Sequence, residues 1–464
     1  MSDPLPALRL LVGSTAAWLV GGAPRDRSLG RATADFDVAI DGDPKPLARA
    51  LAREADGHPF RLSDGFGVWR VVAHDHTWQL DLIPLAGETI EHDLAQRDFT
   101  INAIAEPLAG GVPMDPFGGL EDLRARRLRM VSAEAFERDP LRVMRLARIA
   151  CELGFSVDPE TARVARAYAP GLARVAPERV FYELMRIIRC DRAPEGVALL
   201  DLGGAIDVVL PELAQLRGVE QNRFHHLDVY GHTLAVLEAA IELERDPGAA
   251  LGEHANAVRT ALAQPFAHEL SRGDALRFGA LFHDIAKPQT RGVTDRGRVT
   301  FIGHDVAGAD IAEGALRRLR ASERLIEHVG ALARNHLRLG FLVHSMPLSR
   351  RQIYRYLLDT NPVQIDVTVL SVADRLATRG DNADAAIALH LELARQLLGE
   401  ALAWEDRPPR PPVGGNELVR ALGGLPGPEI GRLLAELQEA SFAGEVNGPD
   451  EALALARELH AGSG

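Results

Sequence analysis

The chain begins with a segment in which short apolar runs alternate with amphipathic stretches. Runs typical of β-strands occupy residues 19–20, 36–40, 68–73 and 78–83, and a helical spacing of apolar residues covers 46–55. The apolar stretch 10–23 contains a glycine pair and is interpreted as a core strand and a loop. This alternation of strand and helix periods over residues 1–125 predicts an α/β arrangement.

The pattern changes at about residue 126, after which little is typical of a strand. Pro140 and Pro177 stand where the first turn of a helix favours proline, and apolar positions three and four residues apart follow each of them. A proline-rich stretch at 406–415 is predicted to be a linker. The predicted domains are a head at 1–125, a helical neck and body at 126–217, a histidine-containing domain at 218–380, and a linker with a helical tail at 381–464.

Length and composition fit a globular protein of several domains. A chain of 464 residues exceeds the roughly 250–300 residues of one hydrophobic core. Its 46% hydrophobic and 25% charged residues exclude a disordered or fibrous protein, and no apolar run reaches the roughly 18 residues of a membrane helix. Cys151 and Cys190 lack the spacing of metal ligands, so we expect buried thiols without a function, in a reducing cytoplasm.

The distribution of charge bears on nucleic-acid binding. A net charge of −13 argues against binding through the whole surface, but arginines cluster between residues 124 and 192. Arginine suits phosphates and base edges, whereas a solvated helix face with glutamate partners explains the same cluster equally well. The arginines that we consider for RNA binding are Arg124, Arg126, Arg127, Arg129, Arg148 and Arg179.

Two aspartates and a glycine turn carry the most specific chemistry. Asp35 and Asp37 lie two positions apart in a predicted strand, so both carboxylates leave the same face and can hold divalent metal. Gly21 and Gly22 follow an apolar run and allow the backbone to approach a phosphate chain, to which Arg25 can add a bidentate contact. A lone Asp-x-Asp is more often a solvated acidic strand, but the combination indicates nucleotidyl transfer.

Further polar residues extend this candidate site. Asp81 lies in a strand-like Leu-Asp-Leu and is a candidate third carboxylate, although a structural role is equally expected. Arg97, Asp98 and Asn102 lie at or before a helical apolar run, where they can hold ribose hydroxyls and phosphates. Taken alone, this group can also be a helix cap.

In this order, the motifs resemble the class II tRNA nucleotidyltransferase and bacterial poly(A) polymerase family, within the DNA polymerase β-like superfamily. The resemblance covers nearly the whole chain and implies an α+β fold, with a polymerase β-like nucleotidyltransferase α/β head, an all-α neck and body, an HD domain and a helical tail. The motifs that carry it are Gly21-Gly22-Ala-Pro-Arg25-Asp26, Asp35-Phe-Asp37, Arg97-Asp98-Phe-Thr-Ile-Asn102, Asp115-Pro-Phe-Gly118-Gly119, Arg138-Asp139-Pro-Leu-Arg142-Val-Met-Arg145 and Pro177-Glu178-Arg179.

The resemblance implies an enzyme that adds C and A to the 3′ end of tRNA from CTP and ATP. Asp35 and Asp37 would bind two Mg²⁺ ions, with Asp81 as the third catalytic carboxylate. Asp139 and Arg142 would read the base, and we expect their helical i, i+3 spacing to put them on one face. The implied nucleotide-binding set is Gly21, Gly22, Arg25, Arg97, Asp98, Asn102, Asp139, Arg142 and Arg145.

Departures from the family pattern leave the product open. Arg138 stands where the family usually has Glu, and Pro24 stands where Val is usual in the glycine turn. The connection from Asp81 to Arg97 is short, which resembles CC-adding enzymes rather than enzymes that build the whole CCA end. Addition of A alone and poly(A) synthesis are further alternatives.

Histidines and aspartates after residue 218 resemble an HD phosphohydrolase domain. Neutral imidazoles and carboxylates suit Mg²⁺, Mn²⁺ or Ni²⁺, and bound metal can activate water against a phosphoester. The resemblance implies phosphatase or phosphodiesterase activity on RNA ends. The alternative is that the domain is a scaffold or a dimer contact. The oligomeric state, monomer or dimer, stays open. The candidate ligands are His232, His283, Asp284 and Asp374 for a first metal, and His304 and His336 for a second.

Overall fold

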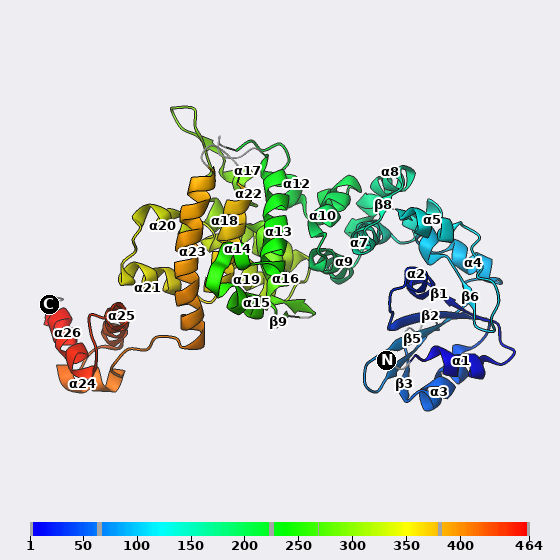
Figure 1. Ribbon diagram of the computed structural model, residues 1–464, viewed down its shortest axis with the longest axis horizontal. Helices are drawn as coiled ribbons and strands as arrows, with labels where there is room; N and C mark the ends of the chain where they lie inside the picture. Colours follow the sequence, from blue (N-terminus) through cyan, green and yellow to red (C-terminus); the bar gives the residue numbers. More distant parts are fainter. Residues whose placement is uncertain (1–2, 63–66, 222–226, 268, 379–382, 462–464) are drawn as a thin grey trace. The chain divides into compact units, whose positions relative to one another are not determined.

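The computed structural model describes residues 3–62, 67–221, 227–267, 269–378 and 383–461 of the chain (Figure 1). The chain divides into two compact units, Met1–Val209 and Leu210–Gly464. The first unit combines a mixed sheet with helices and the second is almost entirely helical, as the α+β prediction requires.

Unit 1 is built on a six-stranded sheet in the order β3-β4-β5-β2-β1-β6. Strands β2 and β5 are parallel, whereas the other neighbours are antiparallel. The parallel pair places Asp37 beside Asp81. The strands are β1 (Ala17–Val20), β2 (Asp35–Ile40), β3 (Gly57–Arg61), β4 (Trp69–Ala73), β5 (Gln79–Pro84) and β6 (Glu106–Pro107).

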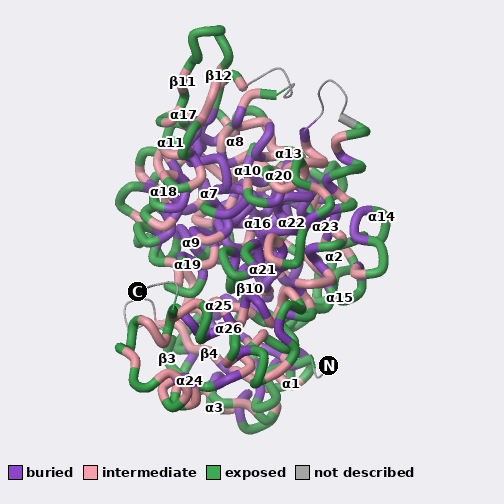
Figure 2. The backbone as a smooth tube through the Cα atoms, turned by 90° about the vertical axis from the view of Figure 1, so that its left-hand side faces the viewer, coloured by how far each residue is buried: buried purple, intermediate pink, exposed green. Residues whose placement is uncertain are grey.

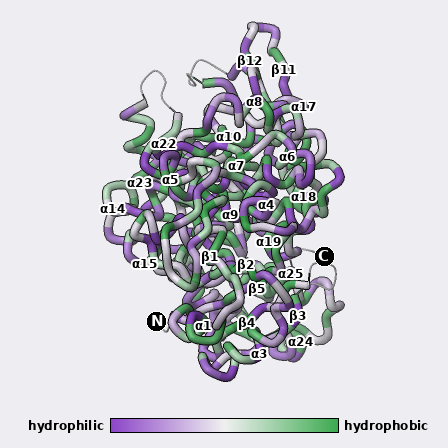
Figure 3. Tube along the Cα trace, turned by 90° about the vertical axis from the view of Figure 1, so that its right-hand side faces the viewer, coloured by the Kyte–Doolittle hydropathy of each residue, from purple (hydrophilic) through white to green (hydrophobic). Residues whose placement is uncertain are grey.

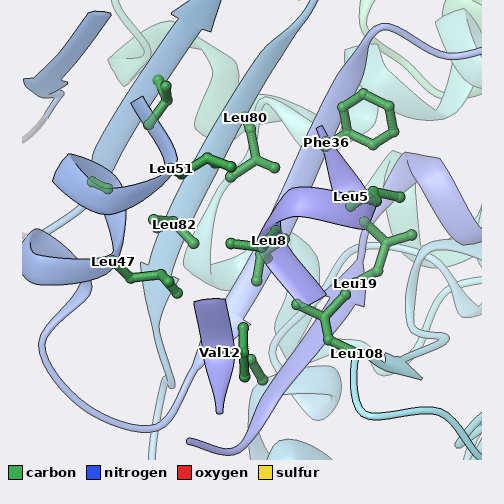
Figure 4. Close-up of a cluster of buried hydrophobic side chains, with 14 of the residues drawn as sticks. Leu5, Leu8, Val12, Leu19, Phe36, Leu47, Leu51, Leu80, Leu82 and Leu108 are labelled. Atoms are coloured by element: carbon green, nitrogen blue, oxygen red, sulfur yellow. The ribbon is translucent and has the colours of Figure 1, made fainter. Parts of the chain in front are cut away.

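The core of the head lies between this sheet and two helices, α1 (Leu5–Val12) and α3 (Pro44–Glu54) (Figure 4). Leu5, Leu8 and Val12 recur at helical spacing and are buried against the strands. The prediction of a strand and loop over 10–23 was therefore wrong at its start, where the helix continues to Val12. Strand β3 was not predicted because its residues are mostly exposed and lack an apolar run.

The remainder of unit 1 is mainly helical, as predicted, apart from a two-stranded sheet of β7 (Arg127–Leu128) and β8 (Ser156–Val157). Helix α7 packs against α9 and α10, and α9 begins at Pro177 as the proline indicates. Cys151 on α7 is buried as predicted, whereas Cys190 after α9 is half-buried, and their thiols donate to the carbonyl oxygens of Arg192 and Arg186 at 3.0 and 3.3 Å. The helices are α2 (Gly22–Ser28), α4 (Ile90–Ala95), α5 (Gly119–Ala125), α6 (Glu134–Arg138), α7 (Arg142–Leu153), α8 (Pro159–Tyr168), α9 (Pro177–Arg189) and α10 (Ala193–Leu202).

Unit 2 packs long helices around two buried ones, α16 and α22, whose residues are mostly purple in Figure 2. A hairpin of β11 (Gly292–Val293) and β12 (Val299–Thr300) has an exposed, mainly hydrophilic loop (Figure 3). The main helices are α13 (Val229–Arg245), α16 (Arg272–Phe282), α18 (His304–Arg318), α19 (Glu323–Asn335), α22 (Gln364–Ala377) and α23 (Ala383–Asp406).

The predicted linker and tail follow α23, which ends at Asp406. Helices α24 (Gly415–Leu422), α25 (Gly427–Ala443) and α26 (Pro449–Ala461) bury an apolar cluster of their own. The predicted domain boundary at 380 lies in 379–382, outside the described residues.

Candidate active site

The carboxylate pair lies on β2, at the centre of the sheet of unit 1. Asp35 is exposed and accepts a hydrogen bond from Gln79 Nε2 at 3.1 Å, while Asp37 is half-buried. Gly21 follows β1 with φ of +74°, and a Cβ atom there would lie 2.5 Å from Asp37 Oδ2. The turn into α2 therefore needs glycine at position 21.

Asp81 lies beside Asp37 in the parallel pair and is buried. Its two oxygens accept hydrogen bonds from Arg70 Nε and Nη2, at 2.6 and 2.7 Å. The candidate third carboxylate is thus next to the pair, but it is already neutralised by a bidentate arginine.

The electrostatics at Asp37 favour a cation. Burial raises the pKa of Asp37 to about 6; the nearby Arg97 opposes this shift, and the carboxylates of Asp35 and Asp81 add to it. Crowded acidic oxygens of this kind are the donor set that Mg²⁺ prefers, because the ion removes their mutual repulsion. Asp35 and Asp37 therefore fit a divalent metal.

These aspartates open onto a cleft of about 530 Å³. The cleft collects every residue of the predicted nucleotide-binding set, although the set spans positions 21 to 145. Asp26, the last residue of the glycine-turn motif, also lines it, as do Thr33, Glu152 and Arg186, to which no motif assigned a place in this site. The complete lining is Gly21, Gly22, Arg25, Asp26, Thr33, Asp35, Asp37, Arg97, Asp98, Asn102, Asp139, Arg142, Arg145, Arg148, Ile149, Glu152 and Arg186.

Asp98 and Asn102 are held by a network of polar contacts within the cleft. Arg25 Nη1 donates to Asn102 Oδ1 at 2.8 Å, and Asn102 Nδ2 donates to Asp98 Oδ1 at 2.9 Å. Burial raises the pKa of Asp98, but the charge of Arg145 and the bond from Asn102 outweigh it and lower the pKa to about 2. Arg145 Nη2 lies 2.7 Å from Asp98 Oδ2. Asp98 is therefore ionised at neutral pH.

The prediction that Asp139 and Arg142 share one face of a helix was wrong. Asp139 has extended backbone between α6 and α7, since the residue before a proline avoids the helical region. Both side chains nevertheless line the cleft. The Arg142 guanidinium donates to the carbonyl oxygens of Gln96, Arg97 and Ala135, at 2.8, 3.2 and 3.2 Å.

The arginines predicted to bind RNA differ in their surroundings. Arg127 and Arg129 form ion pairs with the buried Asp122, at 2.6 and 2.8 Å. Arg148 is buried and lies 2.6 Å from Glu183 and 3.0 Å from Glu152. These three arginines are paired with acidic residues, but they do not form the solvated helix face with glutamate partners considered from the sequence, and their part in RNA binding stays a prediction.

The other three arginines are more accessible to solvent. The side chain of Arg179 is 56% exposed and lies 3.0 Å from Asp139, while Arg124 and Arg126 are exposed on and after α5. These positions keep them available to a phosphate backbone.

Unit 2 brings together all six predicted metal ligands of the histidine-containing domain. His232, His283 and Asp374 offer ligand atoms within 4.8 Å of one another, and so do Asp284, His304 and His336. Asp284 lies between the groups, with Oδ2 3.1 Å from His283 Nε2 and Oδ1 3.2 Å from His304 Nε2. The first group as predicted thus shares Asp284 with the second.

The tautomers of these histidines suit metal binding. The Nδ1 atoms of His283, His304 and His336 lie 2.8, 2.6 and 2.7 Å from backbone carbonyls, which can only accept a hydrogen bond. Their buried Nε2 atoms have no hydrogen-bond partner, so each ring, when neutral, turns a lone pair toward the cluster. Burial lowers the pKa of His336 to about 4, which keeps it neutral, whereas the burial of His283 is outweighed by the charge of Asp284, which raises the pKa of His283. The donor set therefore fits divalent metal.

Fold and site together define a nucleotidyltransferase-type head followed by a helical body and an HD-type metal cluster. Among known families, residues 17–83 and 75–129 match the poly(A) polymerase head domain, and 229–379 match the HD domain. Residues 154–216 match a segment described as the probable RNA and SrmB-binding site of polymerase A.

Known relatives match along nearly the whole chain. An A-adding tRNA nucleotidyltransferase of Deinococcus radiodurans is 36% identical over 95% of this chain and 94% of its own. A CC-adding tRNA nucleotidyltransferase of Thermus thermophilus is 36% identical over 95% of this chain and 92% of its own. A CCA-adding enzyme of Thermotoga maritima, solved with tRNA, has a TM-score of 0.65 at 19% identity and covers 98% and 96% of the two chains.

The chain belongs to the tRNA nucleotidyltransferase and poly(A) polymerase family, and is an enzyme of nucleotidyl transfer. The resemblance inferred from its motifs is confirmed, as are the polymerase-type head and the HD domain. Within the described part of the chain, no helix is both long and apolar enough to cross a membrane.

Proposed function

We propose that this enzyme adds C and A residues to the 3′ end of tRNA, from CTP and ATP and without a nucleic-acid template. The observation that carries the proposal is the cleft of unit 1, where Asp35 and Asp37 adjoin the glycine turn and Arg97. Two-metal transfer requires paired carboxylates next to groups that bind a triphosphate, and this cleft contains both.

In the proposed reaction Asp35 and Asp37 would hold two Mg²⁺ ions, which would supply positive charge at the α-phosphate and favour ionisation of the RNA 3′ hydroxyl. The 3′ oxygen releases its proton to water and bonds to the α-phosphorus as the bond between that phosphorus and the bridging oxygen breaks, and pyrophosphate leaves. Asp81 lies beside the pair as the candidate third carboxylate, with its charge offset by the bidentate pairing with Arg70.

The remaining cleft residues orient the nucleotide. The Gly21 and Gly22 backbone, Arg25 and Arg97 border the space next to the carboxylates and bind the triphosphate. Asp98 and Asn102 bind the ribose hydroxyls, and Arg145 keeps Asp98 ionised for that contact.

Asp139 and Arg142 read the Watson–Crick edge of the incoming base in this proposal. Asp139 offers acceptor oxygens and Arg142 offers donors, so together they can complement either base. Arg142 donates three of its five N–H groups to backbone carbonyls, so Nε and the second N–H of Nη2 can contact the base while these bonds are kept.

Addition of CC alone is a second candidate, favoured by one observation. The connection between β5 and α4 spans only residues 85–89 and is bonded to α4 at Ala86. In the family, the shortness of this connection accompanies CC addition.

A phosphohydrolase activity on RNA ends is the candidate for the HD domain. This activity is favoured by the two groups of metal ligands that share Asp284. Such an arrangement can hold two ions of Mg²⁺, Mn²⁺ or Ni²⁺. A chelator followed by each metal in turn, with a 2′,3′-cyclic phosphate RNA as substrate, tests this activity. The activity is supported if Asp284→Ala loses hydrolysis while a variant of the exposed His344 keeps it. If the wild-type protein hydrolyses this RNA with none of the metals, the domain is a scaffold or a dimer contact.

The product is tested with tRNA transcripts that lack the CCA end, end in C or end in CC, supplied with CTP and ATP separately and together. Full CCA on all three transcripts supports the proposal. Stopping at CC makes the protein a CC-adding enzyme, and extension of the CC transcript alone makes it an A-adding enzyme. Work under reducing conditions is appropriate, because we propose a cytoplasmic protein and Cys151 and Cys190 form no disulfide.

A further inference from the structure

The short connection between β5 and α4 is fastened to α4 through both polar backbone groups of Ala86. Its N–H donates to Asp93 Oδ1 at 3.1 Å, and its carbonyl accepts from Gln96 Nε2 at 3.0 Å. Two side chains of one helix therefore fix one residue of the connection, which limits its motion.

Asp93 has a second contact, made by its other oxygen. Asp93 Oδ2 accepts from Arg97 Nη2 at 2.9 Å and from Arg97 Nε at 3.2 Å. Asp93 is only 5% exposed, so this ion pair is shielded from solvent and its geometry is well defined. The remaining nitrogen, Nη1, lies near Gly21 at the border of the catalytic cleft.

The C-terminal end of α4 also contacts the second arginine of the cleft. The Gln96 carbonyl accepts from Arg142 Nη2 at 2.8 Å and the Arg97 carbonyl accepts from Arg142 Nη1 at 3.2 Å. One end of a short helix thus bonds to the connection, to Arg97 and to Arg142. A displacement of this end would move all three.

We infer that Asp93 and Gln96 are positioning residues. They fix the positions of Arg97 and Arg142 relative to the β5–α4 connection, so that the cleft binds its nucleotide in one geometry. Neither side chain needs to touch the nucleotide. Asp93 acts through the Arg97 guanidinium, and Gln96 acts through Ala86 and its own carbonyl. The inference rests on the proposed nucleotide-binding roles of the two arginines.

The test is a double-mutant cycle on the full-length enzyme. Asp93→Asn keeps the size of the side chain but removes the charge that pairs with Arg97, and Arg97→Ala removes the partner. Steady-state kinetics with CTP and with tRNA are measured for both single variants and the double variant, with thermal unfolding of each. Glu91→Gln is the matched control, because Glu91 is an exposed carboxylate on the same helix.

Asp93→Asn is expected to raise KM for CTP about tenfold, as loss of a charge-assisted hydrogen bond implies, with KM for tRNA unchanged. In the Arg97→Ala background the same substitution should change KM less than about twofold, since its target is gone. Gln96→Ala leaves the ion pair of Asp93 and Arg97 intact and is expected to raise KM for CTP about threefold. This variant tests the inference if Asp93→Asn does not fold.

The inference would be overturned if the effects of Asp93→Asn and Arg97→Ala on KM for CTP were additive. It would also be overturned if Asp93→Asn and Gln96→Ala had the same KM for CTP as the control Glu91→Gln. In both cases the proposed function would still stand. A wild-type protein that extends no tRNA would instead overturn the proposed function, and this inference with it.

Discussion

Gly21 approaches Asp37 so closely that a Cβ atom at position 21 would lie 2.5 Å from the Asp37 carboxylate. The contact arises because β1 pairs with β2 and the chain turns at the end of β1 into α2. Backbone and carboxylate therefore share the border of the space in which the triphosphate and its metal ions are proposed to lie.

Gly21→Ala is predicted to reduce kcat/KM at least about 100-fold, because even a shift of about 1 Å in a reacting group has this effect. Gly13→Ala is the matched control, since Gly13 has φ of 58° and ψ of −122°, close to the 74° and −132° of Gly21, but a Cβ atom there meets no atom within 4 Å. Both variants place alanine in a similar backbone conformation, so equal losses of activity would show that strain, and not the approach to Asp37, is responsible. Transfer of radiolabelled CMP to tRNA measures the effect.

The raised pKa of Asp37 predicts how the metal-free protein responds to pH. The folded pKa, about 6, exceeds the ordinary aspartate pKa of 3.8, so the contribution of this group to stability is full below pH 3.8 and is lost as pH rises through about 6. Urea unfolding with chelator should therefore show a loss of stability between these values that is absent in Asp37→Asn. Mg²⁺ should reduce this loss, because it binds the ionised carboxylate. An identical pH profile for the two proteins would contradict the assignment.

The exposed arginines Arg124 and Arg126 are predicted to contact the tRNA backbone. Replacing both with Ala should weaken tRNA binding and lower the slope of log affinity against log salt by about two, since each arginine displaces about one counterion. KM for CTP should stay unchanged. Unchanged salt dependence in a filter-binding titration would remove these residues from the RNA surface.

Arg148 is predicted to stabilise the helical neck rather than to bind RNA. Arg148→Ala leaves the buried Glu183 without its partner and should lower the free energy of unfolding by about 3–5 kcal/mol. Arg163→Ala breaks an exposed pair with Glu160 and should lower it by less than about 1 kcal/mol. Denaturant titrations compare the two variants, and similar losses would argue that the Arg148 pair is not buried in solution.

Local motifs identified most of the head from the sequence. The apolar runs became β1, β2, β4 and β5, and the residues predicted to bind nucleotide meet in one cleft, because short motifs keep each functional side chain next to its own turn or strand. The roles of these residues stay predictions.

Relations between distant residues could not be predicted in the same way. Nothing near Asp81 in sequence indicates that Arg70 neutralises it, since that pairing depends on the register of β4 against β5. The contact of Cys151 with Cys190 depends on the packing of α7 against α9. The spacing of Asp139 and Arg142 was misleading, because Pro140 keeps Asp139 out of the helix.

The central claim, that Asp35 and Asp37 in the cleft of unit 1 perform nucleotidyl transfer, is tested most directly by following labelled CMP incorporation into tRNA that lacks its CCA end. Wild type and an Asp284→Asn variant of the HD cluster should both incorporate label, while Asp37→Asn should lose at least about a thousandfold in rate, as expected when a metal ligand of the reaction is removed. Incorporation that survives in Asp37→Asn and disappears in Asp284→Asn would contradict the account.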